Sequence, residues 1–251
     1  MTGQDHPTAC VLLIGNELLS GKTQDANLKF LANEMSKLGI RLEEARVIRD
    51  DIDAIVANVN ECRARYTYVF TTGGIGPTHD DITAEAVAKA FDVELVVDPE
   101  AVVRLKHYGK ELNEARLKMA RVPEGATLID NPISAAPGFR IENVFVLAGV
   151  PPIAHAMFAS LEPVLRRGAT IHSRSTEVPL REGDFALELE KIARAHPEVE
   201  IGSYPFARDG RYGASLVVRG TDLAAVESVL AEIKQTMAKL IASREAGPPR
   251  P

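Results

Sequence analysis

Short apolar runs alternate with helical patterns along the first part of the chain, and this alternation limits the possible folds more than any other feature. The first run, Thr8–Ile14, has the length of a strand, and the helical pattern after it closes at Gly39. Two further pairs follow, with strands expected at residues 40–49 and 66–70 and helices that begin at Asp51 and Ala84. Because repeats of strand and helix build parallel sheets with right-handed crossovers, we expect an α/β fold.

The rest of this region is less regular. We expect a short strand at 94–97, a long helix at 99–120 and a segment rich in Pro and Gly at 122–138. Two paired strands at 139–141 and 144–148 and a helix at 151–166 complete the region.

Near Gly168 the pattern changes to strand, helix, two strands and helix. We expect these elements at 170–179, 183–195, 199–206, 212–219 and 221–241, with a turn at Arg208-Asp209-Gly210 between the two adjacent strands. This order is typical of a small α+β domain of the split β-α-β kind. We therefore expect domains at residues 1–167 and 168–251, the second of which ends in a disordered tail from Glu245.

The loop at residues 71–83, with the sequence TTGGIGPTHDDIT, carries the strongest functional signal. It follows a buried strand and precedes a helix, which is where open α/β sheets bind their ligands. Glycines at positions 73, 74 and 76 allow a tight turn and let backbone N–H groups approach a ligand. Those amides and the start of the next helix would form an anion site, to which Thr72 and Thr78 can add hydroxyl donors.

Asp80 and Asp81 in this loop would repel a phosphate by Coulomb interaction. A divalent cation such as Mg²⁺ removes the conflict, because it binds carboxylate and phosphate oxygens together. The alternative is that Asp81 or Thr83 only caps the following helix, which would account for one acidic residue but not for two adjacent ones. We therefore favour a phosphate site that is assisted by a metal.

Other loops are expected at the same edge of the sheet. After the first strand, Glu17 is a candidate for a metal or hydroxyl contact and Ser20 for a phosphate contact, and Asp25 is a candidate cap of the first helix. Of Asp50 and Asp51, one would cap the second helix and the other would face the site. The turns at 134–138 and 149–151 either border the ligand or only connect elements.

Four weaker candidates have ordinary alternatives. His79 in the acidic loop is interpreted as a solvated residue rather than a base or a metal ligand. Asn113, Arg116 and Lys118 lie on the long predicted helix, where cations either meet a phosphate or form a solvated face.

Composition restricts the partners. The formal charge of −6 disfavours nucleic acid, which is held by clusters of Lys and Arg. The longest apolar runs are too short to cross a membrane, and the polar N-terminus is unlike a signal peptide. Cys10 and Cys62 have no spacing typical of metal ligands and fit reduced thiols. We expect a cytoplasmic protein that binds a small molecule.

Several ordered motifs resemble one known family. Residues 15–21 (GNELLSG) and 72–78 (TGGIGPT), followed by Asp80-Asp81-Ile82-Thr83, look like the N-terminal domain of CinA, the competence/damage-inducible protein A. That domain is similar to the molybdopterin-binding MoaB/Mog fold, so the resemblance implies a three-layer, mostly parallel sheet. The resemblance covers roughly residues 8–165 and continues through Pro123-Glu124-Gly125-Ala126, Ala136-Pro137-Gly138-Phe139 and Gly149-Val150-Pro151.

The resemblance implies a molybdopterin or nucleotide ligand and, by similarity to related CinA and FAD synthase domains, cleavage of the pyrophosphate bond of ADP-ribose or FAD with Mg²⁺, Co²⁺ or Ni²⁺. Whether the chain is an enzyme is left open; the alternatives are a non-catalytic pterin- or nucleotide-binding protein and a molybdopterin adenylyltransferase. A homo-oligomer is expected by resemblance as well. The implied catalytic residues are Asp80, Asp81 and Asp50, and the implied metal ligands are Asp80, Asp81 and Glu17. The ligand- and phosphate-binding candidates are Gly15, Glu17, Ser20, Asn27, Thr72, Gly73, Gly74, Gly76, Pro77, Thr78, Thr83, Asn113 and Lys118.

Overall fold

A computed structural model describes residues 6–107, 112–208 and 210–245. The chain divides into two compact units, Met1–Gly168 and Ala169–Pro251, and each is described by itself. The predicted tail beyond residue 245 and Asp209 of the predicted turn lie outside the described residues. Within these residues, none of the helices has both the length and the apolar character that a membrane crossing requires.

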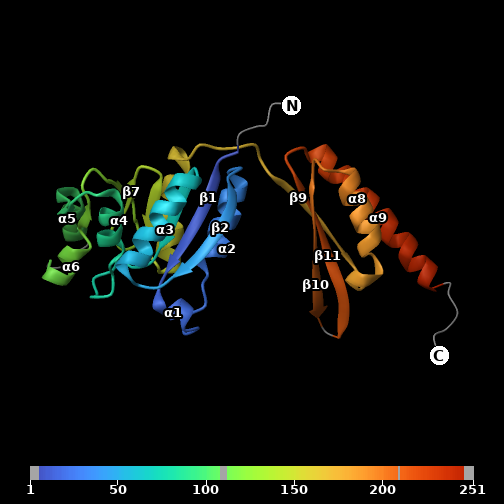
Figure 1. Ribbon diagram of the computed structural model, residues 1–251, viewed down its shortest axis with the longest axis horizontal. Helices are drawn as coiled ribbons and strands as arrows, with labels where there is room; N and C mark the ends of the chain where they lie inside the picture. Colours follow the sequence, from blue (N-terminus) through green and yellow to red (C-terminus); the bar gives the residue numbers. More distant parts are fainter. Residues whose placement is uncertain (1–5, 108–111, 209, 246–251) are drawn as a thin grey trace. The chain divides into compact units, whose positions relative to one another are not determined.

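The first unit is built on a six-stranded sheet with the order β2-β1-β3-β8-β7-β6 (Figure 1). Its strands are β1 (Thr8–Ile14), β2 (Arg41–Ile48), β3 (Tyr68–Thr72), β6 (Thr127–Ile129), β7 (Gly138–Ile141) and β8 (Val144–Leu147). Four neighbouring strands, β2, β1, β3 and β8, are parallel, and β7 pairs antiparallel with β8 and with β6. The expected mostly parallel sheet is confirmed.

Helices cover both faces of this sheet and make three layers. On one face α2 (Asn27–Lys37) and α7 (Pro151–Leu161) pack against Val11, Leu13 and Phe70. On the other face α3 (Ile52–Arg65) and α4 (Thr83–Phe91) pack against Leu12, Ile14 and Val69. Alternate residues of β1 and β3 thus face opposite cores, as the pleat of a strand requires. The chain leaves β1 and β3 towards opposite faces, and this opens a crevice between the two loops that follow them.

Three details differ from the sequence expectations. The short strand β4 (Leu95–Val97) lies outside the main sheet and pairs antiparallel with β5 (Arg121–Pro123), a strand that the sequence did not indicate. The prediction of one long helix at 99–120 was wrong. The described part of this segment contains two helices, α5 (Pro99–His107) and α6 (Glu114–Lys118). The second helix starts after Asn113, because the Asn113 side chain accepts a hydrogen bond from the Arg116 N–H. A short helix, α1 (Asn16–Leu19), occupies the loop after β1, and a 3-10 turn, η1 (Glu162–Val164), follows α7.

The second unit has its own antiparallel sheet, with the order β10-β11-β9. Its elements are β9 (His172–Val178), η2 (Glu182–Asp184), α8 (Ala186–Ala195), β10 (Glu200–Arg208), β11 (Arg211–Gly220) and α9 (Leu223–Glu245). β11 lies between the two strands that α8 connects, which is the split β-α-β arrangement predicted. A separate core that includes Leu216 and Ile233 joins the sheet to the helices.

Candidate functional site

A cavity of about 570 Å³ lies at the carboxyl ends of the parallel strands. Each strand contributes a residue to the cavity wall just beyond its end: Gly15 follows β1, Asp50 follows β2, Gly73 follows β3, and Gly149 follows β8. The volume falls in the range of small-molecule sites, roughly 300–1,000 Å³. The site is therefore placed where the topology of an open α/β sheet leads us to expect it.

Glycine is required at position 73, where the loop after β3 passes close to the end of β1. Gly73 has φ +101° and its N–H donates to the Leu147 carbonyl oxygen at 3.2 Å. A Cβ atom on Gly73 would lie 2.2 Å from the carbonyl oxygen of Ile14, so no other residue fits without moving β1. Gly149 approaches the same point, because its own Cβ would lie 3.2 Å from the Gly73 Cα. The three backbone segments thus meet at one place in the crevice.

The glycine-rich turn presents free amide donors to the cavity. None of the hydrogen bonds within the described residues uses the N–H of Gly74, Ile75 or Gly76, although all three residues line the cavity. The turn itself is held from behind, since Thr83 N–H donates to the Gly74 carbonyl and Thr83 Oγ1 donates to the Gly73 carbonyl at 3.0 Å. Unused backbone N–H groups on a fixed turn are a suitable binding surface for an anion.

The two acidic residues of the loop converge on one hydroxyl group. Thr78 Oγ1 lies 2.5 Å from Asp80 Oδ1 and 2.5 Å from Asp81 Oδ2, and the Thr78 N–H donates to Asp81 Oδ2 at 2.8 Å. The hydrogen bond from Thr78 holds the pKa of Asp80 below its ordinary value of 3.8. Since a hydroxyl group has only one proton to donate, two carboxylate oxygens around it leave lone pairs for a cation.

Asp80 and Asp81 can hold a metal ion only if a bound ligand supplies further coordinating atoms. Within the described residues, no group of three or more His, Cys, Asp and Glu side chains is arranged to hold a metal. Asp80 and Asp81 both line the cavity beside the turn amides, so they supply hard carboxylate oxygens where a phosphate could complete the set. The metal prediction therefore stays a prediction, in which the bound anion provides the remaining oxygen ligands.

Two further carboxylates, from the loops after β1 and β2, line the same cavity. Asp50 Oδ2 accepts a hydrogen bond from the Asn16 N–H at 2.7 Å, which joins the loops after β1 and β2. Asp51 caps α3 through the Ala54 N–H, so one residue of the pair caps the helix and the other lines the cavity. Glu17 also lines the cavity, and its carboxylate packs so closely over Gly15 that a Cβ there would lie 2.5 Å from Glu17 Oε1.

The lining of the cavity also includes an apolar surface. Val150, 55% exposed, is the most open member, and the turns at 134–138 and 149–151 both reach the cavity wall. Asn131 holds the first of these turns, since its amide group donates to Ser134 Oγ and to the Ala136 carbonyl, both at 2.7 Å. The apolar lining residues are Ile14, Ile75, Met119, Ala148, Val150, Pro151 and Ile153. Such a wall suits a flat ring system.

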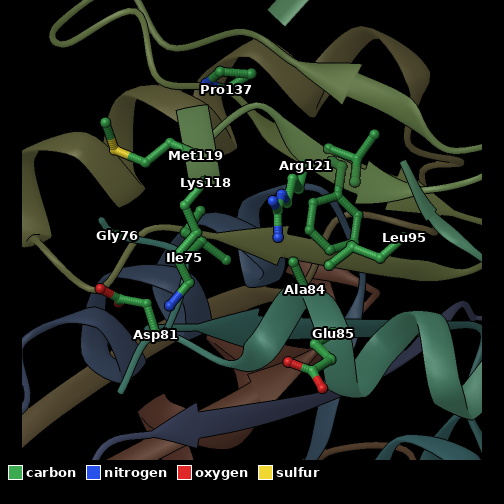
Figure 2. A pocket seen from close by; sticks show the side chains of 13 residues that line it. Ile75, Gly76, Asp81, Ala84, Glu85, Leu95, Lys118, Met119, Arg121 and Pro137 are labelled. Carbon is green, nitrogen blue, oxygen red and sulfur yellow. The ribbon is translucent and has the colours of Figure 1, made fainter. Parts of the chain in front are cut away.

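A second, smaller pocket of about 60 Å³ lies beside the same turn (Figure 2). It shares Gly74, Ile75, Gly76, Asp81 and Met119 with the larger cavity. The Lys118 side chain lines it, and Lys118 Nζ donates to the Thr78 carbonyl oxygen. Lys118 therefore lies beside the glycine-rich loop, and the prediction that it meets a phosphate stays a prediction.

Six of the predicted ligand-binding residues line neither cavity. Ser20 donates to the Glu17 carbonyl oxygen, and Asn113 starts α6. Asn27, Thr72 and Thr83 are buried, so their side chains support the loops and do not face a ligand; Asn27 donates to the Gly149 carbonyl at 2.8 Å. Thr78 is bonded to the two acids. His79 is solvated as interpreted, with its side chain 98% exposed.

Nine other predicted residues line the larger cavity: Gly15, Glu17, Asp50, Gly73, Gly74, Gly76, Pro77, Asp80 and Asp81. Sequence reasoning did not single out Asn131, which lines the larger cavity. It also did not single out Arg121, which lines the small pocket and lies on the strand β5 that no pattern indicated. Neither residue belongs to a motif that would have singled it out.

Comparison with known proteins agrees with the two units. The family described as "Probable molybdopterin binding domain" matches residues 10–167, and the family "FAD synthase, middle domain" matches residues 170–245. A protein of Archaeoglobus fulgidus is 35% identical over 195 residues, which cover 78% of this chain and 84% of that protein. A "Probable FAD synthase" of Caenorhabditis elegans is 32% identical over 261 residues, which cover 92% of this chain but only 50% of that protein.

A solved structure supports the same assignment. The protein CinA from Thermoplasma acidophilum, described as having unknown function, superposes with a TM-score of 0.60 at 33% identity and covers 63% of this chain and 98% of that chain. A domain described as molybdopterin-binding implies a small-molecule ligand. The chain therefore belongs to the probable molybdopterin binding domain family, as a CinA-like protein of the MoaB/Mog fold whose second unit is similar to the middle domain of FAD synthase.

Proposed function

We propose that the chain is a metal-dependent hydrolase of a nucleotide pyrophosphate of the ADP-ribose or FAD type. The observation that carries this proposal is the shared cavity, whose lining contains the free amides of Gly74–Gly76 together with Asp80, Asp81 and Asp50. Anion donors and carboxylates in one place conflict unless a cation lies between the carboxylates and the anion. A pyrophosphate together with a divalent metal satisfies both sets of groups.

Different residues would bind different parts of the substrate and the metal. The turn amides would hold phosphoryl oxygens, and the apolar surface around Val150 and Ile153 would hold a base or an isoalloxazine ring. Asp80 and Asp81, with Glu17 from the lining of the same cavity, would hold the metal, which when bound supplies Lewis-acid polarisation of a phosphoryl oxygen. The hydrogen bond from Thr78, which lowers the pKa of Asp80, favours the ionised form that a metal requires.

The reaction is hydrolysis of the bridging bond. Water attacks one phosphorus atom, the bond from that phosphorus to the bridging oxygen breaks, and two monophosphates leave; from ADP-ribose these are AMP and ribose 5-phosphate. Asp50 uses Oδ2 to accept from the Asn16 N–H, so Oδ1 is the atom that we assign to take the proton of the water.

The test measures AMP released from ADP-ribose and from FAD with Mg²⁺, Co²⁺ or Ni²⁺. We expect turnover with at least one metal, and the Asp80→Asn and Asp81→Asn variants to lower it about a hundredfold or more, since each removes a carboxylate charge that would hold the metal. Glu43→Gln is the matched control, because Glu43 is exposed on β2 and lines neither cavity. Absence of AMP with every metal and both substrates would refute the proposal.

The family description favours a second candidate, a pterin- or nucleotide-binding protein without catalysis. Tight retention of molybdopterin or a nucleotide without cleavage, unaffected by Asp80→Ala, would support it. An adenylyltransferase would instead consume ATP only when molybdopterin is present.

A further inference from the structure

The small pocket contains an arginine that no carboxylate among the described residues neutralises. Arg121 lines it from β5, and within the described residues its guanidinium group makes no hydrogen bond, ion pair or ring contact. Other arginines of this unit that lie near a carboxylate do pair with one; Arg46, for example, binds Glu44 and Glu61, each at 2.7 Å. Glu85 and Asp81 also line the pocket, but Arg121 forms no ion pair with either.

A second cation is held at the same place. Lys118 donates to the Thr78 carbonyl, a contact that directs its ammonium group to the loop that both cavities share. Figure 2 shows Lys118 and Arg121 both directed into the pocket. The free amides of Gly74, Ile75 and Gly76 form the boundary between this pocket and the larger cavity. Two cations and three residues with unused amide N–H groups therefore line the same pocket.

The volume of the small pocket limits the size of the chemical group that it can bind. About 60 Å³ is far below the volume of a site for a ring system, whose lower limit is roughly 300 Å³. Leu95, Val122 and Phe139 are apolar residues of its lining and offer no hydrogen-bonding side chain to a ligand. An end group of a ligand fits such a pocket, whereas a phosphodiester would need room for a second ester chain.

We propose that this pocket is a subsite for a terminal phosphate monoester, bound by Arg121 and Lys118, with the rest of the ligand in the larger cavity. This inference rests on the proposed function, since cleavage of a pyrophosphate leaves a terminal monoester on each product. The guanidinium group of Arg121 can form paired hydrogen bonds to two phosphate oxygens, and Lys118 adds a point charge. Nucleoside monophosphates are therefore ligands of this protein.

The test is binding of matched pairs of ligands to the full chain by calorimetry, without added metal. The pairs are AMP with adenosine and FMN with riboflavin, which differ only in the terminal phosphate. We expect the phosphorylated member of at least one pair to bind about tenfold more tightly than its partner. In Arg121→Met this advantage should fall to less than about threefold, because the bidentate contact is lost.

Arg41→Met is the matched control, because Arg41 is an exposed arginine at the start of a strand and lines neither pocket. It should keep the full advantage. The inference is overturned if wild-type protein binds neither monophosphate, if both members of each pair bind equally, or if Arg121→Met keeps the advantage. These results are independent of turnover, so a chain that binds AMP through Arg121 but cleaves nothing would refute only the proposed hydrolysis.

Discussion

At the scale of single residues, the glycines of the loop after β3 show how the site depends on backbone that no side chain can replace. Gly74 has φ +69°, and a Cβ there would lie 2.1 Å from Thr83 Oγ1. Gly21 has almost the same φ, +72°, but a Cβ there would meet no atom within 4 Å. The two positions therefore separate the cost of the backbone conformation from the cost of the clash.

We expect Gly74→Ala to lower the free energy of unfolding by about 3–4 kcal/mol, because the left-handed backbone and the contact with Thr83 both oppose the methyl group. Gly21→Ala should cost only about 1 kcal/mol, since it has the backbone strain alone. Urea denaturation of both variants measures the difference. Adding Thr83→Ala to Gly74→Ala should recover part of the loss, and equal losses in the two single variants would contradict this explanation.

At the scale of secondary-structure elements, capping and loop contacts decide where helices start and what they reach. Asp25 accepts from the Leu28 N–H at 2.8 Å at the start of α2, and Asp51 does the same for α3. In the second unit His196 follows α8, and its ring lies 3.0 Å from Glu198 Oε1 and 2.9 Å from Glu232 Oε2. This histidine therefore links the connection between α8 and β10 to α9.

The pKa of His196 is raised above 6.5 by its hydrogen bonds to Glu198 and then Glu232. The protonated ring stabilises the folded state, so its contribution is complete below about pH 6.5 and is lost as the pH rises through the raised pKa. We expect the melting temperature of the second unit to fall by roughly 2–4 °C between about pH 6 and pH 9. His196→Gln, which cannot be charged, should remove this part of the dependence; an unchanged dependence in the variant would assign it to other groups.

At the scale of the whole molecule, the two units have hydrophobic cores that share no residue. The core of the second unit consists of residues from Val178 to Met237, and those of the first unit end at Leu165. The connection begins after Gly168, whose N–H still donates to the Leu38 carbonyl at 3.0 Å. The ligand cavity is lined by residues of the first unit only. The expected homo-oligomer and the cytoplasmic location stay predictions.

Because the cores are separate, we expect a destabilising substitution in one unit to leave the stability of the other unit unchanged. Leu216→Ala removes a fully buried side chain of the second core and should cost about 3 kcal/mol. Scanning calorimetry should show the transition of the second unit at a lower temperature, with that of the first unit and nucleotide binding unchanged. Leu31→Ala, in the first core, should do the reverse. A single transition that shifts equally in both variants would contradict the independence.

The sequence alone was sufficient for the features that depend on neighbours along the chain. The spacing of apolar residues predicted β1 to the residue, and the order of elements predicted both the parallel sheet and the split β-α-β arrangement. The glycine-rich and acidic loop was placed correctly because a buried strand followed by a helix always brings such a loop to the carboxyl edge of the sheet. The assignment of one aspartate of the pair 50–51 to a cap was confirmed for the same local reason.

Only the tertiary structure decided which side chains meet. Thr83 and Asn27 look like ligand-binding residues in sequence, yet their surroundings bury them. Lys118 reaches the Thr78 carbonyl across 40 residues, and Arg121 enters the small pocket from a strand of three residues that has no periodicity to reveal it. The physical reason is that local propensity depends on the nearest residues, whereas closeness in space depends on the path of the whole chain, which packing selects.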